Sequence, residues 1–194
     1  MKTVVSTLAL TLGLGIASAA SAVTVSPSVT TWIPGAGVGA DPSRYSAANV
    51  NDGDADFLAL GLGGAAFFNV AGGFTGPITI TEITYNLVDK WLGAYTETAK
   101  VYAGTSYDAD LSSYTLLGSI SNTEAVTGAT LFTSGVFTWL AILDTTPGSS
   151  PSTDGFDIAS VTVAPVPLPA AAPLLVAALG GLGIAARRKA KKAA

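Results

Sequence analysis

The sequence predicts an all-β protein built as a two-sheet antiparallel β-sandwich, and three observations lead to this prediction. Residues 23–163 are rich in Thr, Val, Ile, Gly and aromatic residues, which favour strands and tight turns. Turn-forming clusters interrupt the apolar stretches at short intervals, and no stretch in this region keeps a helical period of useful length. Many short strands without helices must bury their apolar faces sheet on sheet, so Greek-key or jelly-roll connections follow.

Turn signals divide this region into ten expected strands. Gly supplies left-handed backbone and Asn or Asp bonds its own chain locally, as in Asn51-Asp52-Gly53 and Asp108-Ala109-Asp110. The apolar stretches between such turns give the expected strands 23–25, 29–32, 57–62, 65–70, 78–88, 97–103, 114–120, 130–132, 136–143 and 156–163.

In two of these strands, the positions of the apolar residues indicate which face is buried. Ile78 and Ile80 share one parity and Ile83 has the other, so the apolar face stays inward only if one residue loops out. We therefore predict a β-bulge near Thr81-Glu82. Residues 136–143 are apolar at both parities, which predicts a buried strand in the centre of a sheet.

Residues 1–22 have the organisation of a signal peptide. A lysine precedes an apolar core, and the segment closes on small residues. Ala20-Ser21-Ala22 fits the A-x-A pattern of signal peptidase, so we expect cleavage after Ala22, with Ala17-Ser18-Ala19 as the rival site. The sandwich domain, residues 23–163, is therefore expected to be exported.

The chain contains no cysteine and no histidine. An exported domain without cysteine has no disulfides, so its stability must come from a hydrophobic core or from bound ions. The same absence removes most zinc sites, cysteine nucleophiles and Ser-His-Asp triads. Two-carboxylate glycoside hydrolysis with Asp89, Glu97 or Asp144 is the remaining catalytic alternative. Because thirteen acidic residues are scattered along the chain, however, many pairs could be chosen and none of them is a specific signal. We expect no enzyme activity.

Charge is strongly partitioned along the chain. Residues 23–165 carry all thirteen acidic residues and only three basic ones, whereas five of the nine basic residues follow Ala186. An acidic domain repels phosphates, so we expect no nucleic-acid partner and regard cations as suitable partners.

The C-terminal residues 164–194 have three parts. A proline-containing neck, residues 164–167, disfavours helix. Residues 170–186 are uncharged and about 25 Å long as a helix, which predicts one transmembrane helix of marginal length. A basic tail over residues 187–192 would stay cytoplasmic and leave the sandwich on the outer side of the inner membrane. The tail consists of Arg187, Arg188, Lys189, Lys191 and Lys192, with one alanine between.

The order of motif, apolar segment and basic tail resembles a VPLPA-type C-terminal sorting domain, a relative of the PEP-CTERM signals of Gram-negative bacteria. The motif residues are Val166, Pro167, Leu168, Pro169 and Ala170. The resemblance implies an exosortase-type processing protease, cleavage near the motif, and transfer of the domain to the cell surface or extracellular polymer. The alternative is a plain membrane anchor without processing.

The sandwich domain also resembles galactose-binding-like jelly rolls. The resemblance rests on residues 47–53, which include Asn51-Asp52-Gly53, on residues 60–64, and on residues 154–158 before the last expected strand. It implies a jelly-roll order of strands.

One loop is a candidate calcium site. Asp52, Asp54 and Asp56 alternate in a glycine-containing turn, and such a turn can present several carboxylates to an ion that takes six to eight oxygens. Asp154 and Asp157 would complete the shell if the last strand lies beside this loop. The alternative is an acidic, solvated turn.

Trp91 and Tyr95 form a candidate carbohydrate platform. Exposed aromatic rings stack on sugar rings, and Asp89 or Glu97 could accept hydrogen bonds from sugar hydroxyls. The alternative is that Trp91 closes the end of the sandwich core. The sequence therefore predicts an exported, sorted, non-enzymatic surface or matrix protein, and the alternative is a calcium-supported carbohydrate-binding module with the same anchor.

Overall fold

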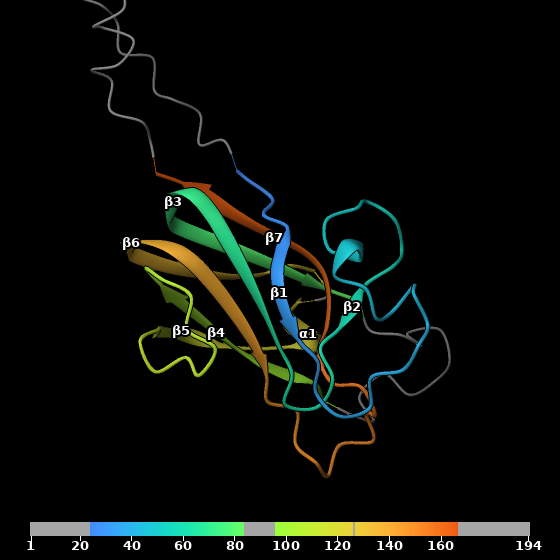
Figure 1. The fold of residues 1–194 in the computed structure, drawn as a ribbon. Coiled ribbons are helices and arrows are strands. Elements are labelled where there is room, and N and C mark those ends of the chain that lie inside the picture. The colour runs from blue at the N-terminus through green and yellow to red at the C-terminus, as the bar shows by residue number, and fades with distance from the viewer. Residues whose placement is uncertain (1–23, 84–95, 126, 167–194) are drawn as a thin grey trace, which may run out of the picture.

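The computed structural model describes residues 24–83, 96–125 and 127–166, and within them the fold is antiparallel β-structure. Figure 1 shows the elements in order. They are β1 (Val29–Ile33), a 3₁₀-helix η1 (Ala47–Asn49), β2 (Leu58–Ala59), β3 (Ala65–Glu82), β4 (Thr98–Gly104), β5 (Thr115–Ser121), α1 (Asn122–Ala125), β6 (Ala129–Asp144) and β7 (Asp157–Pro165). The predicted all-β class is confirmed.

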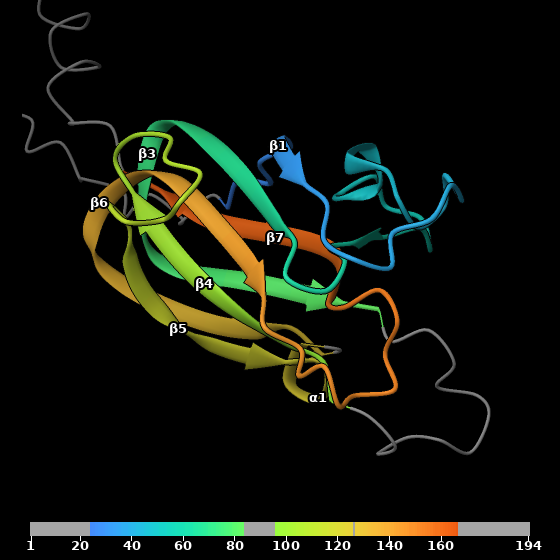
Figure 2. The ribbon, with the colours of Figure 1, turned by 60° about the horizontal axis from the view of Figure 1, so that its bottom comes forward.

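The two longest strands, β3 and β6, each belong to both layers of the sandwich. The first part of β3 pairs with β1 and with the end of β6, while its second part pairs with β7 and with the start of β6. The hydrogen-bonded order is β2-β7-β3-β6-β4-β5, with β1 on β3. Figure 2 shows β3 and β6 curving around the core, so that one continuous path folds into two packed layers.

The bend in β3 corrects the expected strand list. Residues 65–70 and 78–88 were expected as separate strands, as were 130–132 and 136–143, but each pair forms one strand. Gly72, Gly73 and Gly76 all have positive φ, which lets β3 turn sharply without ending its pairing with β6. Sequence patterns mark such a bend as a turn, because glycine clusters usually end a strand.

The main core lies between the two layers. Its largest fully buried side chains come from both layers, and they include Phe68, Phe74, Ile78, Leu140, Ile142, Phe156 and Ile158. Each such side chain contributes roughly 1.5–3 kcal/mol through burial, which gives a fold without disulfides its main source of stability.

The prediction of a buried, central strand at residues 136–143 is confirmed for residues 139–143 only, because Val136 is 58% exposed and the pairing with β4 begins at Trp139. This part of β6 pairs with β3 on one side and with β4 on the other. Leu140 and Ile142 face the main core, while Ala141 and Trp139 face a second cluster that contains Phe67. Tyr107, between β4 and β5, packs edge-on against Phe67 with ring centroids 5.1 Å apart.

The bulge predicted near Thr81-Glu82 exists, but the additional residue lies on the neighbouring strand. Thr81 is the Cα partner of Ser160 and Glu82 is the partner of Ile158, so Ala159 of β7 is the residue without a partner on β3. Glu82 therefore continues the inward face of Ile78 and Ile80 and is buried.

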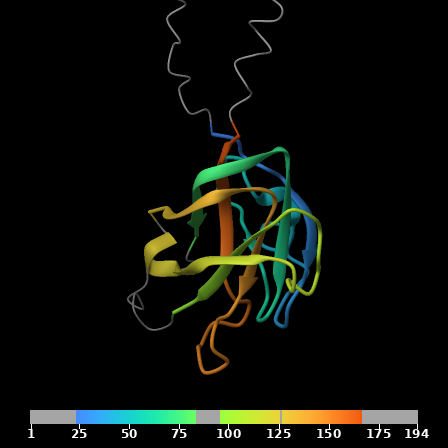
Figure 3. The ribbon, with the colours of Figure 1, turned by 90° about the vertical axis from the view of Figure 1, so that its left-hand side faces the viewer.

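The described chain starts and ends on the same side of the sandwich. Val25 and Val163 form an antiparallel bridge, and Figure 3 shows the two coloured ends side by side. The predicted signal peptide, the transmembrane helix 170–186, the basic tail and motif residues 167–170 lie outside the described residues; only Val166 of the motif is described. None of the described helices has the length and apolar character needed to span a membrane.

Candidate functional site

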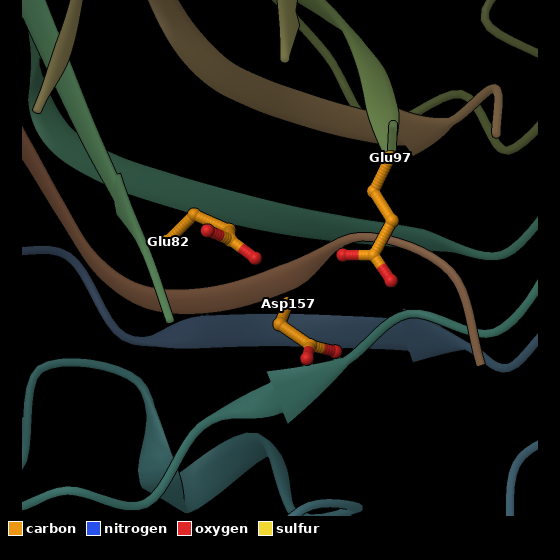
Figure 4. Close-up of side chains that lie close together, drawn as sticks. All are labelled: Glu82, Glu97 and Asp157. Carbon is orange, nitrogen blue, oxygen red and sulfur yellow. The ribbon is translucent and has the colours of Figure 1, made fainter. Parts of the chain in front are cut away.

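Three acidic side chains from three strand ends meet at one end of the core (Figure 4). Glu82 is the last residue of β3, Glu97 immediately precedes β4, and Asp157 is the first residue of β7. One oxygen from each carboxyl group lies within 4.8 Å of the other two. The three residues are 1%, 3% and 2% exposed, respectively. We call Glu82, Glu97 and Asp157 the acid cluster.

Local pairing explains why each carboxyl group lies inside. Strand alternation places Glu82 on the face of Ile80, and the pairing of β2 with β7 sets Asp157 opposite Ala59. Glu97 is fixed through its backbone, because its carbonyl oxygen accepts a hydrogen bond of 3.0 Å from the Asn122 amide. The cluster is thus determined by strand register rather than by one local motif.

Burial dominates the electrostatics of the cluster. The pKa of Glu97 is raised to about 7, chiefly by removal from water and also by the charges of Asp154 and Asp144, against hydrogen bonds from Ser152 and with Glu82 that lower it. Burial also raises the pKa of Asp157 well above its usual range, with the charges of Glu97, Asp154 and Glu82 acting in the same direction. The cluster therefore favours either protons or a bound cation over three bare charges.

Arg44 forms an ion pair with a neighbouring acid, Asp154. Its guanidinium Nη2 donates to Asp154 Oδ2, and the Tyr45 hydroxyl donates to the same oxygen at 3.2 Å. The guanidinium also lies over the rings of Tyr45 and Phe57, at 5.6 and 5.4 Å from their centroids. Arg44 is the last and smallest of the named influences on the pKa of Asp157.

Asp144, at the end of β6, is used for structure. Its Oδ1 accepts hydrogen bonds from the Thr146 hydroxyl at 2.6 Å and from the Phe156 amide at 2.9 Å. Its Oδ2 accepts from the Gly63 amide at 2.8 Å and from the Thr146 amide at 3.3 Å. A carboxylate with four donors holds three chain segments together and has little capacity left for a ligand.

The acid cluster, in contrast, contains oxygens that have no donor. Glu97 Oε2 and Asp157 Oδ1 are buried and have no hydrogen-bond partner among the described residues. Buried polar atoms are nearly always satisfied, so such atoms call for an explanation such as an ion or ordered water. Chemically the three carboxyl groups can hold a hard cation or share protons.

The residues predicted for calcium lie in two separate settings. Asp52 and Asp54 are exposed and Asp56 is half-buried. Asp52 Oδ1 accepts from the Asp54 amide at 3.2 Å, and Asp54 Oδ1 accepts from the Asp56 amide at 2.7 Å. Burial, together with the charges of Asp54 and Asp52, raises the pKa of Asp56.

Asp154 and Asp157 are buried, so the structure does not gather the five predicted ligands into one group. Of the five, only Asp157 belongs to the acid cluster. Calcium binding by the Asp52 loop stays a prediction.

Two members of the cluster were not expected as ligands. Glu82 was named only for its position near the predicted bulge. Glu97 was considered as a hydrogen-bond acceptor beside Trp91 and as a catalytic acid, whereas it is 3% exposed. The signal for Glu82 was the unbroken alternation Ile78, Ile80, Glu82. Trp91 and Tyr95 lie outside the described residues.

No family model matches the chain, and no curated protein matches it either. Solved structures do show similarity. The CBM32 of AlyQ, in complex with 4,5-unsaturated mannuronic acid, matches with a TM-score of 0.48 and 10% identity over 72% of this chain and 97% of that one. The family 32 CBM of C. perfringens NanJ, in complex with galactose, matches with a TM-score of 0.45 and 15% identity over 73% and 98%.

A larger structure, truncated AlyQ with CBM32 and alginate lyase domains, matches with a TM-score of 0.49 and 14% identity over 74% of this chain. The chain spans 34% of that protein's length. These neighbours are of the kind expected from the jelly-roll resemblance in the sequence. At such identities and TM-scores the similarity is a partial one of fold, and no ligand or site is transferred from it.

Proposed function

We propose that this chain is an exported, non-enzymatic β-sandwich binding module that acts at the cell surface or in extracellular polymer, with carbohydrate as its ligand and calcium as a supporting ion. The proposal that the domain is not an enzyme rests on the burial of the acid cluster. Glu82, Glu97 and Asp157 are at most 3% exposed, so a substrate cannot reach them as it reaches the paired carboxylates of a hydrolase. Asp144, another of the three acids considered for catalysis, is occupied by four donors, and Asp89 lies outside the described residues.

The carbohydrate part rests on the connection between β3 and β4. Residues 83–97 join the end of β3 to the start of β4, and this stretch of sequence contains Trp91 and Tyr95 together with Asp89. Aromatic rings beside a hydrogen-bond acceptor are the usual components of a sugar-binding surface. Loops at the end of a rigid sandwich commonly carry binding residues.

A glycan array tests this part. The full-length chain, purified in a mild detergent, is compared with the variants Trp91→Ala and Phe132→Ala. Phe132 lies on β6 and is 73% exposed, so its replacement controls for the loss of an exposed aromatic ring elsewhere. Selective loss of glycan binding in Trp91→Ala supports the platform. Equal binding by both variants, or no binding by the parent chain, contradicts it.

The surface location rests on the sequence of the two ends. Cleavage after Ala22 and processing near Val166–Ala170 would leave a mature sandwich without its apolar ends. Intact mass of the envelope-associated protein reports both cleavages at once. A mass that retains residues 187–192 would favour a plain membrane tether over sorting and release.

A further inference from the structure

We infer that Glu82, Glu97 and Asp157 together bind one calcium ion that cross-links the two layers of the sandwich. This site is separate from the Asp52 loop, and it does not depend on carbohydrate binding. Three observations support it: the spacing of the oxygens, the atoms left without donors, and the positions of the three residues in the fold.

The spacing suits calcium. Calcium bonds to oxygen at about 2.3–2.6 Å, so oxygens on opposite sides of the ion are about 4.6–5.2 Å apart. One oxygen from each carboxyl group of the cluster lies within 4.8 Å of the others, so the three fit on a single calcium ion. Magnesium demands near-ideal octahedral geometry at about 2.0–2.1 Å and usually keeps several waters, so it is less suited to a buried cluster of three carboxyl groups.

The oxygens without donors point to the same ligand. Glu97 is 3% exposed and Asp157 is 2% exposed, yet Glu97 Oε2 and Asp157 Oδ1 accept no hydrogen bond within the described part of the chain. Figure 4 shows the Glu97 side chain directed toward the space between Glu82 and Asp157. A cation placed between the carboxyl groups would supply both of these oxygens with a partner and would offset the repulsion among the three charges.

The neighbouring groups have bonds of their own. Arg44 is bonded to Asp154, and its ring contacts with Tyr45 and Phe57 hold it at that position. Asp144 is saturated by donors from the backbone and Thr146. Ser152 bonds to Glu97 and leaves the Oε2 atom for the ion. Remaining positions of a six- to eight-oxygen shell are open to water.

The position of the cluster gives the ion a structural task. Glu82 ends the part of β3 that pairs with β7, and Asp157 begins β7, so both belong to one layer. Glu97 precedes β4, which pairs with β5 and the end of β6 in the other layer. An ion held by all three would join the layers at one end, as a disulfide does in exported domains that contain cysteine.

Calcium titration of the full-length chain in detergent tests the inference. After treatment with EDTA at pH 7.5, calcium binding is followed by calorimetry, and the melting temperature is recorded with and without about 5 mM calcium, which is above the range usual for extracellular sites. The variants are Glu97→Gln and Asp157→Asn, with Asp54→Asn as the control for the exposed loop. Magnesium at the same concentration is the control for ion type.

The expected result is a calcium-dependent rise in melting temperature that Asp54→Asn keeps and that both cluster variants lose, with a smaller rise for magnesium. Without calcium, Glu97→Gln should melt above the parent chain, because the amide removes a buried charge; this readout also shows that the variant is folded. The inference is overturned if the parent shows neither binding nor a rise, or if the rise survives in both cluster variants.

Discussion

Glu82 on β3 is the Cα partner of Ile158 on β7, although Thr81, one residue earlier, is the partner of Ser160. The skipped residue, Ala159, turns its carbonyl oxygen to the Asn51 amide, which donates to it at 2.9 Å. Asn51 Oδ1 in turn accepts from the Val161 amide at 2.8 Å. This bulge in β7 leaves both Asp157 and Ile158 buried and keeps Glu82 on the inward face of β3. The acid cluster therefore depends on strand register.

The first prediction concerns pH. Glu97 has a pKa of about 7 in the fold and an ordinary value of 4.5, so between these two pH values the native state binds a proton that the unfolded chain has released. The free energy of unfolding of the calcium-free chain should therefore fall as pH rises from about 4.5 to 7, and the deficit should persist above pH 7. Its size should be on the order of a few kcal/mol.

Urea unfolding in EDTA at pH 5 and pH 8 measures this difference. Asp157, whose pKa is also raised, acts in the same direction. Asp108, whose pKa is lowered to about 2 by hydrogen bonds from Ser113 and Ser112, affects stability only at lower pH, below its ordinary value of 3.8. Glu97→Gln should show a flatter pH dependence than the parent chain. A parent chain that is equally stable, or more stable, at pH 8 would contradict the assignment of Glu97.

The second prediction concerns Asp144. Replacement by alanine leaves two buried donors, the Phe156 amide and the Thr146 hydroxyl, without their acceptor, whereas the amide of the exposed Gly63 can bond to water instead. Each buried donor left unsatisfied costs about 1–3 kcal/mol, so Asp144→Ala should lower the free energy of unfolding by at least about 2 kcal/mol. Asp110→Ala, at an exposed position, is the matched control and should change stability by less than about 0.5 kcal/mol. Urea unfolding compares the two variants. Similar unfolding midpoints would contradict the role of Asp144 in holding the three chain segments together.

The fold could be predicted from the sequence further than the site could. Composition and turn spacing indicate an all-β sandwich, and the two apolar parities of residues 136–143 identify the central strand. The same patterns separate β3 and β6 into pieces, because Gly72, Gly73 and Gly76 act as a bend within a strand instead of ending it. Local rules describe the conformation of each glycine and cannot describe the long-range pairing that continues across it.

The acid cluster shows a different limit. Glu82, Glu97 and Asp157 are far apart in sequence, and no local spacing relates them as it relates Asp52, Asp54 and Asp56. Which strand ends meet depends on the strand order and on the skipped residue Ala159. An acidic residue in strict alternation with two apolar isoleucines was the available signal for Glu82, although burying a charge generally costs free energy.

The third prediction concerns Arg44. Arg44→Ala removes the partner of Asp154, which is 5% exposed, together with the ring contacts to Tyr45 and Phe57. Because the Arg44 side chain is 25% exposed, water partly screens the pair, and we expect a loss of roughly 2–3 kcal/mol. Arg44→Lys keeps the charge but loses the planar group that lies on the rings, so it should recover only part of the stability. Thermal unfolding ranks the three chains, and lysine matching arginine would show that the ring contacts contribute nothing.

The fourth prediction compares two glycines with positive φ. Gly155 has a φ of +73° and Gly53 a φ of +88°, so an alanine at either position adopts a left-handed conformation at a cost of about 1–2 kcal/mol. At Gly53 an added Cβ meets nothing within 4 Å, whereas at Gly155 it would lie 2.8 Å from Asp144 Oδ1. Gly155→Ala should therefore lose clearly more stability than Gly53→Ala.

Because Gly155 lies two residues before Asp157, Gly155→Ala should also weaken calcium binding, while Gly53→Ala should not affect the acid cluster. Urea unfolding in EDTA, followed by calcium titration of each variant, separates the two effects. Equal losses of stability in the two variants would mean that Asp144 can move away from the added Cβ at little cost in free energy. Unchanged calcium affinity in a destabilised Gly155→Ala chain would mean that the start of β7 keeps Asp157 in place independently of this turn.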